Sequence, residues 1–271
     1  MSKYLIVFDN HCGICNLGVK LATRIGIISS ESKAALSTHK ENNITCNIDP
    51  QRACDEMAVV NKATYQTYYG TKGYILLLSE KFPSLSKLLK SKIVFKIINP
   101  FYIFLASNRR IIAPLNVSEA NCTPTLKKKY RLFMMFILGV FATVITYKKG
   151  EIFSNFEMFS FLNGYKFIQV TGVGWILTGL FFKGKNKWDY WGHLSVMAGT
   201  AILIQSFALI GFHYTPHFAW IIGSMIISDL LMLYMHYSRV KIMQLSQKFT
   251  IRWWLILHIT ATISILQYYL Y

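Results

Sequence analysis

The chain has few acidic residues, few prolines and few cysteines for its length. Its 271 residues include 12 Asp and Glu against 29 Lys and Arg, together with 6 Pro and 5 Cys. Five cysteines are too few for a disulfide-rich scaffold, and a hydrophobic fraction of 53% excludes a disordered chain. With a mean hydropathy of +0.35, the composition predicts a membrane protein rather than a purely soluble one.

The second half of the chain, residues 127–271, has no cysteine, only four acidic residues and long runs without charge. Five apolar stretches lie there: 132–147, 167–182, 190–212, 218–237 and 253–271. A spanning helix needs about 20 mostly apolar residues, a length that the last three stretches meet well. We therefore expect an all-α transmembrane helix bundle of about five spans over 132–271. Its basic residues are clustered between the runs, which indicates membrane loops rather than a nucleic-acid-binding surface.

Lysine and arginine are concentrated before the first stretch, between the second and third, and between the fourth and fifth. With five spans these segments share one side, which the positive-inside rule makes cytoplasmic. The apolar run near the N-terminus is too short for a secretory signal and stops at Asp9. The prediction is a multi-pass inner-membrane protein in contact with the lipid bilayer. Its domain 1–113 is cytoplasmic, a basic juxtamembrane linker covers 114–131, and Tyr271 lies outside.

Two cysteines, Cys12 and Cys15, lie between a strand-forming run at 4–8 and a helical pattern. At a helix N-terminus the first thiol meets the positive end of the helix dipole, which lowers its pKa. The second thiol lies one turn further, close enough to attack a mixed disulfide. A cytosolic Cys-x-x-Cys is typical of a redox-active pair, whereas a zinc site normally needs a second pair of ligands. Metal binding and an inert pair are the alternatives.

The helical pattern after the cysteines has Leu17, Leu21 and Ile25 at intervals of four, which places them on one helix face, and Gly26 is suited to end the helix. Other predicted elements are a hairpin at 56–69, helices at 73–80 and 84–96, and breaks at Pro100, Pro114 and Pro124.

The residues Phe8-Asp9-Asn10-His11-Cys12-Gly13-Ile14-Cys15 resemble the signature of the DCC family of thiol-disulfide oxidoreductases. The later segment Pro100-Phe101-Tyr102, leading to Ala106-Ser107-Asn108-Arg109-Arg110, is similar to the closing segment of that family. The resemblance covers about residues 4–113 and implies an α/β thioredoxin-like domain. It also implies thiol-disulfide exchange with protein thiols or disulfides, with no cofactor required.

The signature residues suggest individual roles. Cys12 is the expected attacking thiolate and Cys15 the resolving thiol. Asp9 has two interpretations, as the acceptor of the Cys15 proton or as a turn residue that caps the helix. His11 also has two, as an imidazolium that holds the thiolate or as a loop histidine facing solvent.

Charged and sulfur residues elsewhere in this half are expected to lie outside the site. Arg109 and Arg110 are predicted on a solvated face or one that meets lipid headgroups. Cys46, Cys54 and Cys122 are predicted to be bystander thiols, with a second relay pair of Cys46 and Cys54 as the alternative.

Ionisable residues in the membrane half are costly in lipid, so each is a candidate for function. The expected topology places His193, His236 and His258 toward the cytoplasmic leaflet, where their convergence would form a quinone, haem or metal site. Asp229 lies mid-span and needs a partner. The simpler interpretation is hydrogen bonding between helices.

The leading functional hypothesis is a membrane-anchored thiol-disulfide oxidoreductase acting through Cys12 and Cys15. A membrane scaffold or assembly factor with a non-catalytic Cys pair is one alternative. A membrane electron-transfer protein that binds a quinone or haem near the three histidines is the other.

Overall fold

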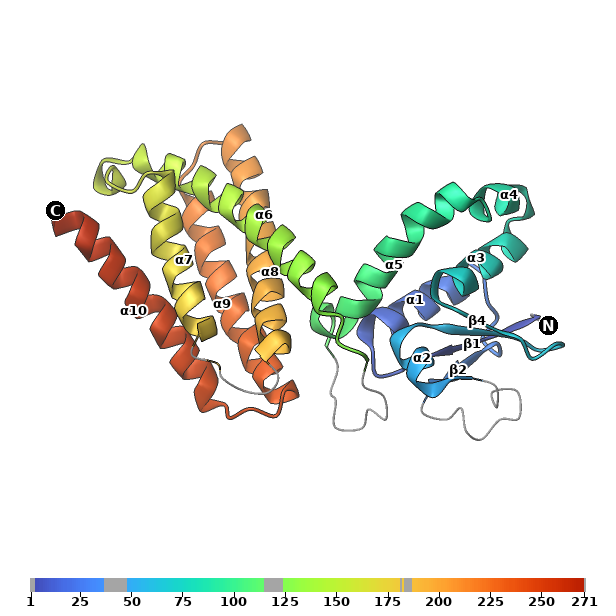
Figure 1. The fold of residues 1–271 in the computed structure, drawn as a ribbon. Coiled ribbons are helices and arrows are strands. Elements are labelled where there is room, and N and C mark those ends of the chain that lie inside the picture. Colours follow the sequence, from blue (N-terminus) through green and yellow to red (C-terminus); the bar gives the residue numbers. More distant parts are fainter. Residues whose placement is uncertain (1–2, 37–47, 115–123, 181, 183–186, 271) are drawn as a thin grey trace. The chain divides into compact units, whose positions relative to one another are not determined.

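The computed structural model describes residues 3–36, 48–114, 124–180, 182 and 187–270. The chain forms two compact units, Met1–Tyr130 and Arg131–Tyr271. The first unit combines helices with a four-stranded sheet, and the described elements of the second are all helices (Figure 1). The division lies at the end of the linker expected over 114–131.

The first unit alternates strands and helices before it becomes helical. Its elements are β1 (Tyr4–Phe8), α1 (Gly13–Arg24), β2 (Lys33–Ala35), α2 (Pro50–Asp55), β3 (Ala58–Asn61), β4 (Thr67–Tyr69), α3 (Gly70–Lys81), the 3-10 turn η3 (Pro83–Leu85), α4 (Ser86–Leu89) and α5 (Lys92–Ile112). The sheet order is β2-β1-β3-β4, with β1 parallel to β2 and the other two pairs antiparallel. The crossover through α1 makes the first pair parallel, and a short turn makes β3 and β4 a hairpin.

Alternate residues of β1 enter two apolar cores, as the period of two along a strand requires. Leu5 and Val7 share one core with α2, whereas Tyr4 and Ile6 share the other with α1 and α3. The sheet is therefore covered on both faces, and the loop that follows β1 emerges beside the first turn of α1.

The helix expected from Leu17, Leu21 and Ile25 is present as α1, and Gly26 follows its end with a φ of 70°. These three side chains are 48% to 59% exposed, however, and α1 buries Val19 instead. The spacing predicted the helix and the shared face, but that face points away from the core.

Two predictions about the helical part of this unit need correction. The single helix expected over 84–96 is divided, because Ser91 caps a new helix by accepting a hydrogen bond from the Val94 N–H at 3.2 Å. The break expected at Pro100 is wrong, since Pro100 lies inside α5. The proline removes only one helical hydrogen bond, and the exposed turn before it can be solvated. The hairpin expected at 56–69 is confirmed by β3 and β4.

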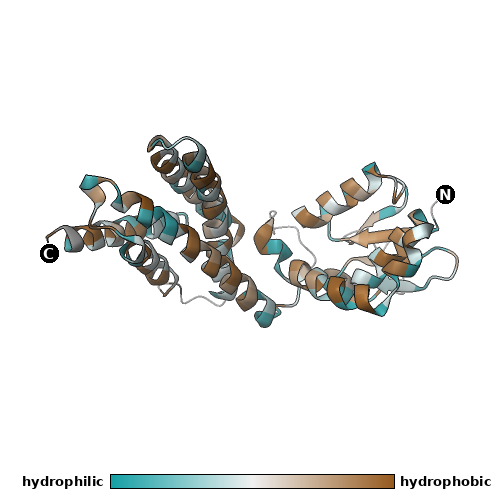
Figure 2. Cartoon of the chain, turned by 90° about the horizontal axis from the view of Figure 1, so that it is seen from above, coloured by the Kyte–Doolittle hydropathy of each residue, from teal (hydrophilic) through white to brown (hydrophobic). Residues whose placement is uncertain are grey.

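The second unit contains α6 (Lys128–Ser154), the 3-10 turn η4 (Glu157–Phe159), α7 (Gly164–Leu180), α8 (Lys187–Tyr214), α9 (Ala219–Ile242) and α10 (Lys248–Leu270). Within the described residues, four helices are long and apolar enough to cross a membrane, namely α6, α8, α9 and most of α10. The helix α7 has 17 residues and is not among them, so four candidate spans stand where about five were expected. Figure 2 shows the apolar residues along these helices.

Candidate functional site

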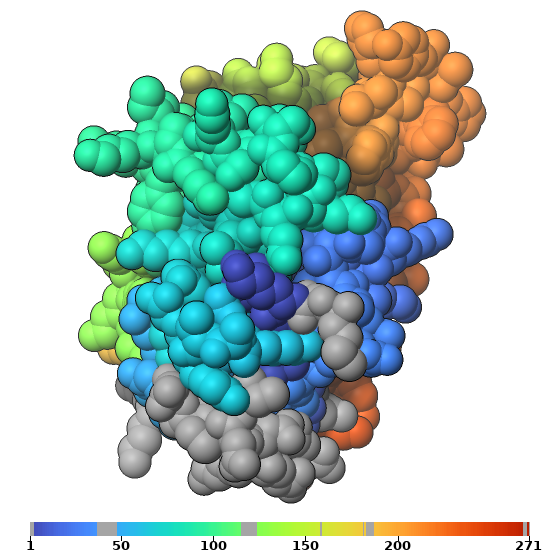
Figure 3. Space-filling view, turned by 90° about the vertical axis from the view of Figure 1, so that its right-hand side faces the viewer, coloured from blue at the N-terminus to red at the C-terminus, as the bar shows by residue number. Residues whose placement is uncertain are grey.

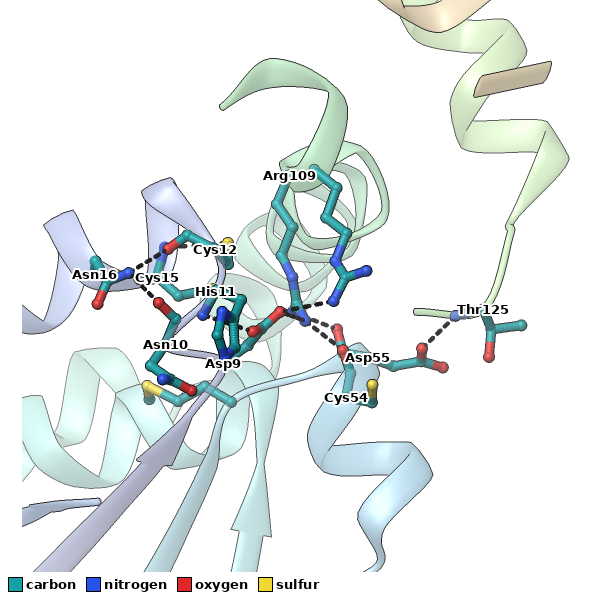
Figure 4. Close-up of polar contacts among 12 residues, drawn as sticks. Asp9, Asn10, His11, Cys12, Cys15, Asn16, Cys54, Asp55, Arg109 and Thr125 are labelled. Carbon is teal, nitrogen blue, oxygen red and sulfur yellow. Dashed lines mark hydrogen bonds and ion pairs between the residues drawn. The ribbon is translucent and has the colours of Figure 1, made fainter. Parts of the chain in front are cut away.

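The Cys-x-x-Cys pair opens α1, with Cys12 at the N-cap position. Both Cys12 and Cys15 are free thiols, and the Cys12 Sγ accepts a hydrogen bond from the Cys15 backbone N–H at 3.3 Å (Figure 4). Cys12 is fully buried and Cys15 is half-buried. The first N–H groups of a helix have no partner within the helix. In α1 one of them, that of Cys15, donates to the Cys12 sulfur and stabilises negative charge there.

The two sulfurs differ strongly in acidity. The hydrogen bond from the Cys15 thiol lowers the pKa of Cys12 to about 7; the Cys15 N–H and the Arg109 charge act in the same direction, against burial. The same hydrogen bond, together with burial, raises the pKa of Cys15. Burial works to lower the pKa of Arg109, but the charges of Cys15, Cys12 and Asp9 outweigh it and raise that pKa. The two shifts are opposite, so Cys12 is the sulfur that ionises first and Cys15 keeps its proton and donates to it.

Asp9 lies in a buried ion pair rather than at a helix cap. Its Oδ2 lies 3.3 Å from Arg109 Nη2 and 3.5 Å from Arg110 Nη2, and its Oδ1 accepts the His11 N–H at 3.0 Å (Figure 4). The Asp9 and Arg109 side chains are only 2% and 5% exposed. The capping interpretation of Asp9 is therefore corrected: Cys12 is the N-cap, and Asp9 fixes the loop before it.

Arg109 is the residue of the candidate site whose position differs most from the prediction. It does not lie on a solvated face, because it also donates hydrogen bonds to the backbone carbonyls of Asp55 and Cys54 at the end of α2. Arg110 is partly buried and shares Asp9. Arg109 and Asp9 are 100 positions apart in the sequence, so no local pattern joins them. The one available signal was the segment around Asn108 and Arg109 that resembles the DCC closing segment.

An apolar cavity of about 360 Å³ lies against the site, within the first unit. Its walls come mainly from apolar side chains of α1, α3, α4 and α5, and its polar lining is Asp9, Cys15, Thr71, Tyr74, Tyr102 and Arg109. Cys15 lines this cavity, whereas Cys12 is not among the lining residues. The thiol pair therefore borders a mostly apolar cavity, whose polar lining includes Cys15 itself, Asp9 and Arg109.

Two tyrosines lie in the cavity wall: Tyr74, which the sequence did not point to, and Tyr102, which belongs to the segment that resembles the DCC closing segment but was given no role. The rings of Tyr74 and Tyr102 meet edge to face with centroids 5.6 Å apart, and the Tyr102 hydroxyl accepts the Met57 N–H at 3.0 Å. Burial raises the pKa of Tyr74 to about 12, and the charges of Cys15 and Cys12 add to the rise. Tyr74 is thus a neutral phenol that can donate a hydrogen bond near the pair.

The structure also bears on the predictions for His11 and for the cysteines outside the pair. The His11 ring has no hydrogen bond or ion pair with any residue that the structure describes, which favours the solvent-facing interpretation. Cys54 is disulfide-bonded, so the prediction of a bystander thiol is wrong for it. Cys46 and Cys122, including the proposed pair of Cys46 with Cys54, lie outside the described residues.

In the second unit, His193 and His236 have protein partners on neighbouring helices. Arg239 donates a hydrogen bond to His193 Nδ1. The ring nitrogens of His236 hydrogen-bond to the hydroxyls of Tyr190 and Thr250, each at 3.1 Å. Both nitrogens of His236 are therefore used, and neither is free to ligate a haem iron.

Four further ionisable residues of that unit form two ion pairs, His258 with Asp229 and Arg131 with Asp189. His258 Nε2 lies 3.4 Å from Asp229 Oδ1 and its Nδ1 hydrogen-bonds to the Trp254 carbonyl, so His258 is the partner that Asp229 needed. Arg131 lies 2.9 Å from Asp189. Among the described residues, no hydrogen bond joins His258 to His193 or His236. The described residues also contain no group of three His, Cys, Asp or Glu side chains that could hold a metal ion. Hydrogen bonding between helices accounts for these residues.

Comparison with known proteins gives no match for this chain among protein-family models, curated proteins or solved structures. The similarity to the DCC family stays a resemblance of the residues quoted above, and the functional argument depends on the geometry of the site.

Proposed function

We propose that this protein is a membrane-anchored thiol-disulfide oxidoreductase that acts through Cys12 and Cys15. The observation that carries the proposal is the hydrogen bond from the Cys15 N–H to the Cys12 sulfur at the start of α1. This contact, the Cys15 thiol and the buried Arg109 charge all favour a thiolate at Cys12. The candidate membrane-spanning helices of the second unit supply the anchor.

The exchange reaction takes place in two displacements. The Cys12 thiolate attacks one sulfur of a substrate disulfide, forms a mixed disulfide and releases the other substrate sulfur, which takes up a proton. The Cys15 sulfur then loses its proton and attacks the Cys12 sulfur. The Cys12–Cys15 disulfide forms, and the second substrate sulfur leaves as a thiol. The substrate gains two electrons from the pair and two protons, one from Cys15 and one from solvent, to which Cys12 gave up its proton when the thiolate formed; the reverse sequence oxidises a substrate dithiol.

Arg109 and Asp9 position the pair for this chemistry. Arg109 brings a fixed positive charge close to both sulfurs, and a nearby cation stabilises a thiolate relative to a thiol. Asp9 holds that guanidinium and the backbone of the loop before Cys12. We assign the proton-acceptor role for Cys15 to Asp9 as part of the proposal, because both residues line the cavity.

Access to Cys12 is restricted by the end of α5. A Cβ added to Gly13 would lie 3.1 Å from the Ala113 Cβ, so the two segments are in close contact. Because Cys12 is fully buried, exchange at its sulfur requires a local opening, and we propose that the end of α5, which packs against the neighbouring Gly13, is the part that moves. We expect Cys12 to react with small alkylating reagents much faster than with bulky ones of the same chemistry.

The topology supports a thioredoxin-like domain. A parallel β1–β2 pair joined by α1, followed by the β3–β4 hairpin and α3, is compatible with the fold that the resemblance implies. If α7, at 17 residues, crosses the membrane as a fifth span, the basic segments share one side, and the distribution of lysine and arginine then supports a cytoplasmic location for this domain. We therefore propose protein thiols or disulfides on that side of the inner membrane as the substrates.

The proposal is tested by trapping. In a Cys15→Ser variant the resolving thiol is absent, so a mixed disulfide at Cys12 cannot be released by its neighbour. We expect discrete adducts on a non-reducing gel after acid quenching, and their mass spectra would identify the substrates. The matched control is Cys12→Ser with Cys15→Ser, which must lose every adduct. Adducts that persist in this control, or none in the single variant, would favour the non-catalytic scaffold.

A further inference from the structure

A lysine-rich segment at one edge of the first unit is distinct from the thiol site. It comprises residues 81–101, which include the end of α3, η3, α4 and the first turns of α5, and we call it the basic lip. The segment carries five lysines and no acidic residue: Lys81, Lys87, Lys90, Lys92 and Lys96. All five are exposed, and side chains of this part of the chain project outward in Figure 3, where it is coloured teal to green.

The same segment exposes large apolar side chains between the lysines. Leu85, Leu88, Ile93, Ile97 and Phe101 are 47% to 74% exposed. The last three follow one another at intervals of four in α5, so they form a single stripe along that helix. Soluble surfaces rarely expose extended apolar patches, and apolar side chains alternating with lysines are typical of helices that lie on a membrane.

The first unit also continues directly into a candidate membrane-spanning helix. The helix α6 is such a span, and its first residues, up to Tyr130, belong to the first unit. The buried Asn108 side chain donates a hydrogen bond to the Tyr130 carbonyl at 3.2 Å. The Thr125 N–H donates to Asp55 Oδ1 at 2.6 Å. The segment that leads into the membrane is thus hydrogen-bonded to the body of the first unit.

We propose that the basic lip lies on the surface of an anionic lipid bilayer. Its apolar side chains enter the boundary between headgroups and acyl chains, and its lysines lie among the lipid phosphates. Charge selects this occupant, because five lysines without an acidic residue are complementary to an anionic surface. Leu89, Ile98 and Phe101 also line the cavity beside Cys15, so contact with lipid would bring the membrane surface to that cavity.

The test uses the full chain reconstituted in vesicles, with the photoreactive residue benzoylphenylalanine at position 93 or 97. We expect lipid adducts, detected by the mass of the intact protein, in vesicles that contain phosphatidylglycerol, and at least about fivefold fewer with phosphatidylcholine alone. The control is position 65, because Tyr65 is also an exposed large side chain, at 47%, but lies in the β3–β4 turn. There we expect only background labelling.

A second variant tests the charge directly. Replacing Lys87, Lys90, Lys92 and Lys96 by Gln should reduce lipid adducts at position 93 by about tenfold. Adducts to protein in place of lipid, equal labelling at position 65, or equal labelling with both lipids would overturn the proposal. The proposal does not depend on thiol chemistry, so Cys12→Ser should give the same lipid adducts as the parent chain.

Discussion

The two units hold their charged residues in different ways. In the first unit, the Asp9–Arg109 pair is almost fully buried, lies beside two free thiols and borders an apolar cavity. In the second unit, the His258 and Asp229 side chains are 41% and 31% exposed, and their contacts are with other helical residues. Arg239 of the second unit is as buried as Arg109, so the two units differ in what their charges contact: a thiol pair in the first unit and residues of neighbouring helices in the second. Under the proposed function, the charges of the first unit prepare the pair for exchange.

The largest effect is expected from Arg109→Gln. This change leaves the Asp9 carboxylate without its main partner and removes the guanidinium that donates to two backbone carbonyls. Breaking a buried ion pair from one side should lower the free energy of unfolding of the first unit by about 3 kcal/mol. Denaturant unfolding of the full chain in detergent, followed by probes in the first unit, measures this loss.

Arg110→Gln is the matched control, because both arginines lie within ion-pair distance of the same Asp9 oxygen. The Arg110 side chain is 21% exposed and its contact is longer, so we expect a loss of about 1 kcal/mol. Equal losses for the two variants would contradict the special role of Arg109.

A smaller effect, confined to the second unit, is expected from His236→Ala. The change leaves the Tyr190 and Thr250 hydroxyls without their shared partner and removes a ring stacked on Trp253 at 4.4 Å. We expect the free energy of unfolding of the second unit to fall by about 2 kcal/mol, with no change in the rate of Cys12 alkylation. An altered Cys12 rate would show that the two units are coupled and that the contrast between them is wrong.

The smallest effect is expected from His11→Gln. The His11 ring has no hydrogen-bonding or ionic partner among the described residues, and its backbone N–H contact with Asp9 survives the change. The rate of Cys12 alkylation at neutral pH should therefore change by less than about twofold. A drop of tenfold would restore the interpretation of His11 as an imidazolium that holds the thiolate.

Local patterns in the sequence predicted the elements that carry the cysteines. The run at 4–8, the loop and the helical spacing after it were sufficient to place Cys12 at the start of α1. The same spacing could not show which side of α1 faces the core, because Leu17 and Leu21 recur as regularly on an exposed face as on a buried one. Burial depends on what packs against a helix, which local periodicity does not contain.

The long-range part of the site could not be derived from spacing. Arg109 reaches Asp9 only because α5 returns across the unit, and the cavity is assembled from four helices. The hydrogen-bonding partners of the membrane histidines also depend on how helices are paired. His193 and Asp189 share a helix face in the sequence, yet each binds a residue of another helix. Such contacts follow from tertiary packing rather than from the local pattern.

The proposed function depends on Cys12 being the reactive thiolate of the pair. We would measure the rate of Cys12 alkylation by iodoacetamide against pH in the full unsubstituted chain, followed at the Cys12 peptide by mass spectrometry. The pKa of Cys12 is lowered from its ordinary value of 9.0, so the reactive form is present above the folded pKa and lost below it. We expect a midpoint near pH 7; a midpoint near pH 9 would mean that Cys12 is an ordinary thiol.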